Sequence, residues 1–458
     1  MRKKIDSAPM FPIIISNCDL KVVTDFQDKY DEISKLLDVN PGILDAVHSD
    51  IATMGSDQGR ESSYSSEQFM RMLVVKCIEG LSYRDTIVRV ADSGILRNFT
   101  RIYSGDIMNF TALDAASKMI APQTWDKINI QFAKYVIKSG KVKGEKQRVD
   151  STVSETNIHY PTDASLLWDS YRVGARFISQ CRELDHRLDF GNRFHDKKVK
   201  RSYTFIATNF SRKTPATQRA VRRHTKHLMK QVSRVSKIGH AIVSNCKPIQ
   251  INECATARIL ELERMLVLVD HVIAQSTRAF NGEVVPAAER IFSIFEPHTE
   301  LLKRGKAHKP NEFGHLVSIG QTGEKFIDFY RVEEKSRHDI VLGDEAKEAH
   351  KKLFGFYPKK FTADKNYYGG PEHTEKWEEK INEYSVGKKG NRTEDETERE
   401  HDDWFKILQA FRAGCEGSIS VLKRVFGLHR CLNRTFKSFA SSVGCLVFCH
   451  NLVVVSRL

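Results

Sequence analysis

The sequence FRAGCEGSISVLKR, residues 411–424, places Arg412, Glu416 and Lys423 at successive offsets of four and seven. In a helix, which turns by about 100° per residue, these offsets bring the three side chains onto one stripe. An apolar stripe about 100° away consists of Phe411, Cys415, Ile419, Leu422 and Phe426. We predict a helix from about residue 404 to 426 whose apolar stripe packs on a sheet. The charged stripe then lies at the edge of that contact, where a groove could form.

The charged stripe has a simpler alternative interpretation. Arg412 and Glu416 are four residues apart, and an exposed pair at this spacing stabilises a helix by only a few tenths of a kcal/mol. The helix alone does not separate a salt bridge from a functional site.

Two aspartates elsewhere favour a functional site. Asp150 lies between Val149 and Ser151 in a stretch that alternates like a strand, and Asp364 ends the strand-like run FTAD. Aspartate is depleted in strands, so an aspartate at each of these positions suggests a functional role. If these two carboxylates and Glu416 converge, they offer the hard oxygen ligands that Mg²⁺ or Mn²⁺ prefers. Two such ions would support in-line attack on a phosphodiester.

This order of Asp, Asp and Glu resembles the DDE transposases of bacterial insertion sequences. In a large group of these enzymes the glutamate helix carries Tyr, two residues, Arg, three residues, Glu, six residues and Lys. Arg412, Glu416 and Lys423 match that spacing, whereas Gln409 occupies the tyrosine position. The segments VDST at 149–152 and ADKNYYG at 363–369 are similar to the first and second aspartate blocks of the family.

The resemblance covers most of the chain and implies both fold and chemistry. It implies an α/β RNase H-like catalytic core at 141–458, with catalytic and metal-binding residues Asp150, Asp364 and Glu416. Two Mg²⁺ ions, replaceable by Mn²⁺, would activate water to nick the ends of the element. The freed 3′-OH would then attack target DNA without a covalent protein intermediate. Arg412 and Lys423 would contact the DNA, and a homodimer would hold the two terminal inverted repeats.

The N-terminal part, residues 1–140, is predicted to be an all-α DNA-binding domain. Ser65 or Ser66 can cap a helix that stops at Gly80, and Ser82 can cap a second helix that ends near Gly94. Two short helices joined by a tight turn suit a helix-turn-helix, although any small helical bundle has the same pattern. Residues 65–99 also resemble the helical domain with which these transposases bind terminal repeats.

A basic helical insertion is predicted at about 165–290. From Arg193 to Lys237 there are fourteen Lys or Arg and one acid, Asp196, so nearly all of the net charge of +14 lies here. Solvated faces normally mix both signs, so we predict contact with the phosphates of double-stranded DNA. The predicted contacts are Arg219, Arg222, Arg223 and Lys226.

Composition favours a soluble, cytoplasmic and nucleoid-associated protein. Charged residues make up 28 % of the chain, and the nine cysteines contain no CxxC pair, which suggests a reducing compartment. The apolar C-terminal stretch is interrupted by Ser441, Ser442 and His450, so we predict a buried helix rather than a membrane span. Cys445, Cys449 and His450 cluster within it at helical spacing, and buried thiols are favoured there over a metal site.

Two other functions remain open at this point. The first is a nuclease of the same fold that does not join strands. The second is a DNA-binding regulator descended from a transposase, although loss of a catalytic carboxylate would be expected for it and all three are present.

Overall fold

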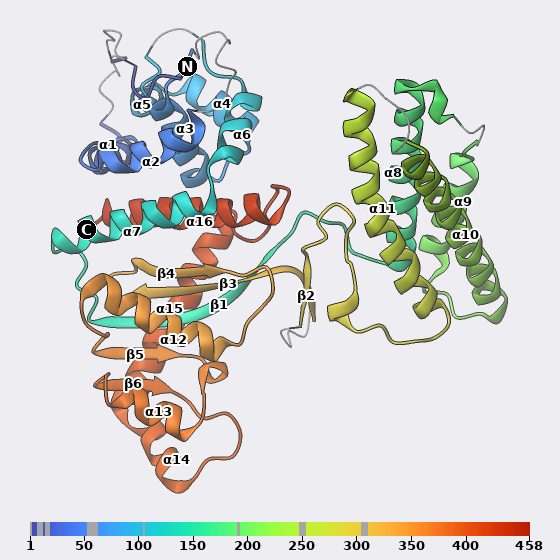
Figure 1. Cartoon of the computed structure of the whole chain (residues 1–458). Coiled ribbons are helices and arrows are strands. Elements are labelled where there is room, and N and C mark those ends of the chain that lie inside the picture. Colours follow the sequence, from blue (N-terminus) through green and yellow to red (C-terminus); the bar gives the residue numbers. More distant parts are fainter. Residues whose placement is uncertain are drawn as a thin grey trace. The chain divides into compact units, whose positions relative to one another are not determined.

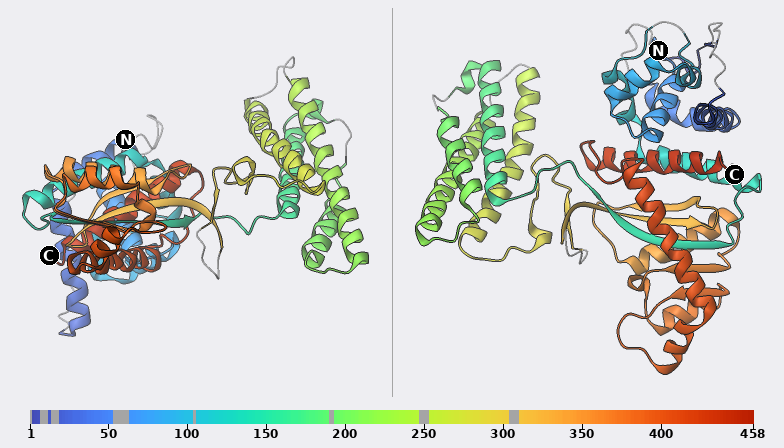
Figure 2. Two further views of the ribbon diagram at one scale, coloured as in Figure 1. Left: turned by 90° about the horizontal axis from the view of Figure 1, so that it is seen from below. Right: turned by 180° about the vertical axis from the view of Figure 1, so that it is seen from behind.

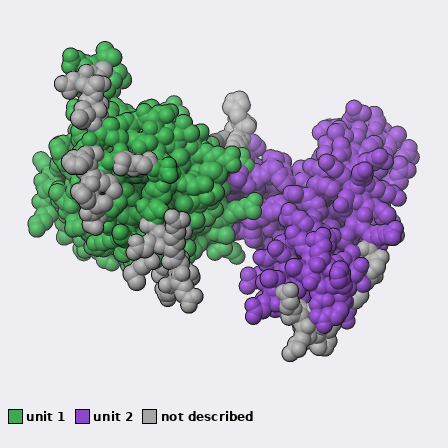
Figure 3. All heavy atoms as spheres, turned by 90° about the horizontal axis from the view of Figure 1, so that it is seen from above, with its two compact units in different colours: residues 1–155, 315–458 green, residues 156–314 purple. Residues whose placement is uncertain are grey.

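The computed structural model describes residues 2–6, 12–13, 19–52, 63–103, 106–189, 193–246, 253–303 and 310–458 (Figure 1). The chain forms two compact units (Figure 3). One comprises residues 1–155 and 315–458, and the other comprises residues 156–314. The N-terminal helices therefore belong to the same unit as most of the sheet. The predicted domain boundary at residue 140 stays a prediction.

Seven helices precede the sheet in the described part of the first unit: α1 (Lys21–Asp38), α2 (Pro41–Ile51), α3 (Ser66–Ile78), α4 (Tyr83–Asp92), α5 (Gly94–Thr100), α6 (Phe110–Met119) and α7 (Pro122–Lys138). Ser65 caps α3 in a capping box with Gln68, and Ser82 caps α4. Gly80 supplies the left-handed conformation, with φ of 64°, that the turn between these helices needs. The predicted helix pair is therefore confirmed. α3 is buried along nearly its whole length, whereas α4 leaves Arg84, Val88 and Arg89 exposed.

The sheet is built from β1 (Lys146–Glu155), β2 (Glu300–Lys303), β3 (Asn311–Thr322), β4 (Ile327–Val332), β5 (Lys360–Ala363) and β6 (Glu383–Val386). Its order is β3-β1-β5-β6, with β4 beside β3. β4 is antiparallel to β3, whereas β1, β5 and β6 are mutually parallel. β2 pairs with residues 311–314 at the start of β3. The chain is thus mixed α/β, as predicted.

Helices cover both faces of the sheet (Figures 1 and 2). On one face lie α12 (Asp339–Phe354) and α13 (Pro371–Glu378), and α13 connects the parallel strands β5 and β6. On the other lies α15 (Asp403–Arg424), preceded by α14 (Glu394–His401). Neighbouring side chains of β1 contact the helices on opposite faces of the sheet. Gln147 donates to Ala346 O in α12, and Arg148 donates to Phe411 O in α15.

The last helix, α16 (Phe436–Val455), runs beside α7 between the other N-terminal helices and the sheet (Figures 1 and 2). Trp125 of α7 donates to Ser441 Oγ, and the rings of Phe132 and Phe448 lie 5.6 Å apart. Among the described helices α16 alone is long and apolar enough to cross a membrane, but 78 % of its apolar window is buried inside the fold. The predicted buried helix is confirmed.

The second unit is mainly a helical bundle, as predicted for residues 165–290. It contains α8 (Asp163–Leu184), α9 (Asp196–Asn209), α10 (Pro215–Cys246) and α11 (Glu253–Phe280). Its core consists of apolar side chains at helical spacing, among them Leu228, Val232 and Val235 of α10 and Leu262, Leu266 and Val269 of α11. The bundle thus has its own hydrophobic core.

Candidate functional site

Asp150 lies on β1, and Asp364 directly follows β5, the parallel neighbour of β1. The register pairs Val149 of β1 with Ala363 of β5, so the next residues along the chain, Asp150 and Asp364, stand side by side. Adjacent strands run about 4.8 Å apart, which brings both carboxylates to one end of the sheet. Each carboxylate is locally oriented, because Asp150 accepts from its neighbour Ser151 N and Asp364 accepts from Lys365 N, both at 2.7 Å.

Helix α15, which carries Glu416, is fixed across the same strands by Arg148. This buried arginine of β1 donates from Nη1 to Phe411 O at 2.8 Å and from Nε to Gln321 Oε1 at 2.9 Å. Ser418 of α15 donates to the same Gln321 oxygen at 3.0 Å. Burial lowers the pKa of Arg148, but its ordinary value is high enough for the side chain to stay charged. A buried guanidinium with these partners sets the position of the helix.

Gly414 permits the close approach of helix and strand. A Cβ atom at this position would lie 2.0 Å from Arg148 Nη1, whereas nothing lies within 4 Å of a Cβ at Gly417. A side chain at the first glycine of the segment AGCEG would therefore displace the Arg148 guanidinium, whereas one at the second glycine would not.

Gln409, which stands in the family's tyrosine position, anchors the start of this contact. Its amide nitrogen donates to Ser385 O in β6 at 2.9 Å and to Thr362 Oγ1 in β5 at 3.3 Å. Thr362 lies two residues before Asp364. The departure from the family pattern is thus a structural link between α15 and the strand that carries the second aspartate.

Glu416 reaches the surface beside this contact. Its side chain is 61 % exposed, and Arg412 Nη1 lies 3.2 Å from its Oε1. The charges around the buried Cys415, which is next to Glu416 in the chain, shift the pKa of its thiol. Burial, then Asp150 and then Glu416 raise the pKa of the Cys415 thiol to about 12, against the opposing charges of Arg148 and Arg412. The charges of Asp150 and Glu416 therefore both act on this thiol.

Asp150, Asp364 and Glu416 are not drawn together as tightly as metal ligands. Among the described residues, one group of three or more His, Cys, Asp or Glu has ligand atoms all within 4.8 Å of one another, and it consists of Cys77, Cys445 and Cys449. The three carboxylates share one region of the fold without forming such a group. The Arg412–Glu416 ion pair, which the sequence offered as the simpler interpretation, is present.

Sequence reasoning missed the residues that hold the site together. Arg148 was visible as a charged residue two positions before Asp150, on the same face of the strand. Gln321 carried no signal, because a glutamine at a strand end is ordinary. Asp339 was also missed, although its carboxylate accepts from Ser151 Oγ at 3.2 Å and adds a negative charge beside β1.

The basic segment of the second unit forms an exposed row on α10. Arg219, Arg222, Arg223 and Lys226 are all exposed. Arg222 lies over the Phe280 ring at 4.3 Å, and the described residues provide no carboxylate partner for the other three cations. The opposite side of α10 supplies core residues, so this row faces solvent. A row of unneutralised cations is suited to an extended polyanion.

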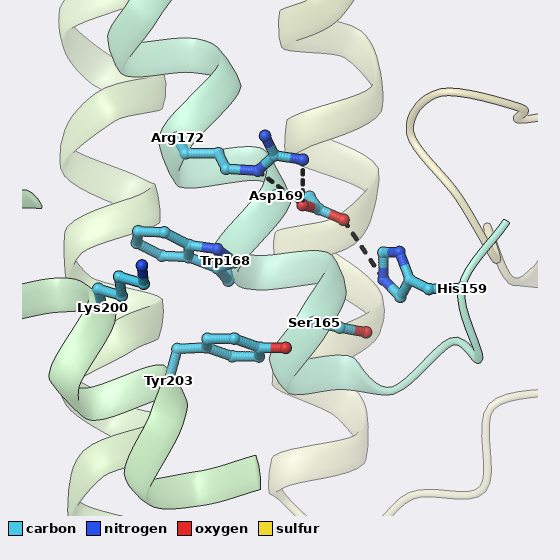
Figure 4. Close-up of a pocket in the computed structure, with 7 residues that line it drawn as sticks. All are labelled: His159, Ser165, Trp168, Asp169, Arg172, Lys200 and Tyr203. Carbon is cyan, nitrogen blue, oxygen red and sulfur yellow. Dashed lines mark hydrogen bonds and ion pairs between the residues drawn. The ribbon is translucent and has the colours of Figure 1, made fainter.

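A hollow of about 370 Å³ lies wholly within the second unit, and Figure 4 shows its lining. Asp169 binds Arg172 at 2.9 Å and His159 at 3.4 Å. The rings of Trp168 and Tyr203 are nearly parallel, with centroids 5.7 Å apart and an interplanar angle of 8°. Aromatic faces beside cationic side chains are the combination that contacts single-stranded nucleic acid by stacking and charge.

Comparisons of this chain with protein-family models, with curated proteins and with solved structures give no match. The resemblance described above therefore rests on the motif residues themselves, and the positions of those residues in the fold carry the functional argument.

Proposed function

We propose that this chain is a DDE transposase that cleaves the ends of an insertion sequence and joins them to target DNA. The observation that carries the proposal is the placement of the three motif carboxylates. Asp150 of β1 and Asp364 at the end of β5 stand side by side, and the helix that bears Glu416 is bonded across those strands through Arg148 and Gln409.

The strand arrangement supports an RNase H-like core. In chain order the strands β1, β3, β4, β5 and β6 form a sheet in which β4 and β3 are antiparallel neighbours on one side of β1, and parallel β5 and β6 lie on the other. Helices cover both faces. This is the arrangement expected for that fold, with the first aspartate in the central strand.

The donor set fits Mg²⁺ or Mn²⁺. All three motif side chains offer carboxylate oxygens, and Glu416 is 61 % exposed, so its carboxylate is open to a ligand. When bound, such ions supply Lewis-acid stabilisation and an activated water for attack on the phosphodiester. Asp150, Asp364 and Glu416 would hold the ions. Arg412 and Lys423 would offset the repulsion between the carboxylates and the phosphates, and Arg412 can in addition orient an oxyanion through its planar fork.

Contacts with double-stranded DNA extend beyond the carboxylates. The row Arg219, Arg222, Arg223 and Lys226 would bind phosphates without reading bases, and the exposed face of α4 would contact the terminal repeats. A homodimer would hold two such ends, and the protein would act on chromosomal DNA in the cytoplasm.

A strand-transfer assay tests the proposal. The full chain is incubated with Mg²⁺, with duplexes that carry the two DNA ends flanking its gene, and with a supercoiled target plasmid. Joined products that need Mg²⁺ and disappear with Asp364→Asn are the expected result. Cleavage without joining would identify a nuclease, and binding to the ends without cleavage would identify a regulator.

A further inference from the structure

Three cysteines from distant parts of the sequence meet inside the first unit. Cys77 lies on α3, and Cys445 and Cys449 lie one turn apart on α16. The Sγ atoms of Cys77 and Cys445 are 3.5 Å apart, and all three Sγ atoms lie within 4.8 Å of one another. All three side chains are buried. The sequence showed only the pair on the last helix, so the third thiol is a result of the fold.

The spacing of the sulfur atoms excludes a disulfide between Cys77 and Cys445 and leaves room for a shared metal ion. Two sulfurs bound to one tetrahedral zinc at 2.3 Å are about 3.8 Å apart, whereas bonded sulfurs are about 2.05 Å apart. The Cys77–Cys445 distance of 3.5 Å is close to the first value. A zinc ion would need only small adjustments of these side chains.

A lysine lies beside the cluster. Lys76 precedes Cys77 on α3, lines the same cavity as Cys77 and Cys445, and is half-buried with its ammonium 4.7 Å from the Tyr83 ring centroid. One divalent cation, three thiolates and one ammonium sum to zero charge, which suits a buried site.

A cavity gives access to the cluster from one side. It has a volume of about 710 Å³, and its lining includes Lys76, Cys77, Cys431 and Cys445. Zinc in proteins takes four ligands. The space of the cavity can supply the fourth ligand as water.

We propose that Cys77, Cys445 and Cys449 form a binding site for one Zn²⁺ ion whose fourth ligand comes from the cavity. The ion replaces the protons of the thiols, which pass to solvent, and no electron transfer is involved. It joins α3 to α16, and so fixes the helix that precedes α4 to the helix that lies against the sheet. This site is independent of the three carboxylates and of the proposed DNA chemistry.

Cobalt titration of the full-length protein tests the site. The reduced wild type should bind one equivalent of Co²⁺ with a thiolate-to-cobalt charge-transfer band and the intense visible absorption of a tetrahedral ion, and Zn²⁺ should displace it. Cys449→Ser and Cys445→Ser should each weaken binding at least tenfold. Cys181→Ser, at a buried thiol in the second unit, is the matched control and should bind like the wild type. Equal binding by the cluster variants and the control would overturn the proposal.

A second measurement does not depend on how the variants fold. Native mass spectrometry of the wild type after addition of one equivalent of Zn²⁺ should show one retained ion, with its mass offset by the protons released. Thermal melting of the same sample should shift upward by several degrees and return on chelation. Absence of a retained ion in the folded wild type would overturn the site.

Discussion

Helices α15 and α10 each carry a row of charges beside an apolar stripe, but they hold those charges in different ways. α15 is pinned to the sheet by hydrogen bonds from Arg148, Gln409 and Ser418. α10 packs on its bundle mainly through apolar side chains, with polar contacts such as those of Ser236 and His240 to Asp270, and the cations of the row project into solvent. The first arrangement fixes where a charge lies, whereas the second fixes only how much charge is present. We therefore expect single substitutions to matter on α15 and only collective ones to matter on α10.

The largest effect is expected from the carboxylates that α15 crosses. Asp364→Asn keeps the size of the side chain and removes the charge that would hold an ion. Metal ions supply several kcal/mol of transition-state stabilisation, and each tenfold change in rate corresponds to about 1.4 kcal/mol. We therefore expect the cleavage rate to fall by about 1000-fold. Affinity for the end DNA should change by less than about threefold, since phosphate and base contacts lie elsewhere. Gel-based cleavage and a binding titration on one preparation check both, and parallel losses of both would contradict the assignment.

The second-largest effect is expected when the row of cations on α10 is neutralised. Changing Arg219, Arg222, Arg223 and Lys226 to Gln should weaken binding to every DNA sequence alike, by about 100-fold at low salt. The slope of log K against log salt should flatten by about 0.9 for each phosphate that the row no longer neutralises. Fluorescence anisotropy at several salt concentrations measures the slope. The control is the same charge change at four exposed lysines of the first unit, Lys335, Lys351, Lys352 and Lys380. An unchanged slope with weaker binding to one sequence only would show that the row reads bases.

A matched pair of glycines on α15 should give the third effect. Gly414→Ala places a methyl group against the Arg148 guanidinium, so we expect a loss of about 1–3 kcal/mol in unfolding free energy and about tenfold in cleavage. Gly417→Ala meets nothing within 4 Å and should instead stabilise the helix by about 0.5–1 kcal/mol. Chemical denaturation and the cleavage assay on both variants decide the matter. Similar behaviour of the two would mean that Arg148 does not position the helix.

The smallest effects should come from the charged stripe itself. Arg412→Lys keeps the charge but loses the fork, so cleavage should fall several-fold, whereas Lys423→Arg should be tolerated and Lys423→Ala should impair end binding or joining. The exposed Arg412–Glu416 pair contributes only about 0.3–0.5 kcal/mol to stability. Cleavage, end binding and melting temperature are measured on each variant. If the pair is only a salt bridge, Arg412→Lys is harmless, Lys423→Ala is silent and any loss follows the melting temperature.

Local pattern predicted most elements, because their signals lie within a few residues. The caps Ser65 and Ser82 and the apolar stripe of α15 are of this kind. Helix α12 was not predicted, and neither was β2. The pairing of β1 with β5 and the bonds of Arg148 depend on chain segments more than 150 residues apart, which no local pattern encodes. The third cysteine of the buried cluster escaped for the same reason.

The central claim is that Asp150, Asp364 and Glu416 bind divalent ions as one unit, and a count of bound Mn²⁺ tests it most directly. Electron paramagnetic resonance of the full chain bound to end DNA gives the number of ions held per chain. We predict that Asp150→Asn, Asp364→Asn and Glu416→Gln each lower that number by at least one. The control Glu394→Gln, at an exposed position of α14, should leave it unchanged. The same number of bound ions in the wild type and in all three variants would contradict the claim.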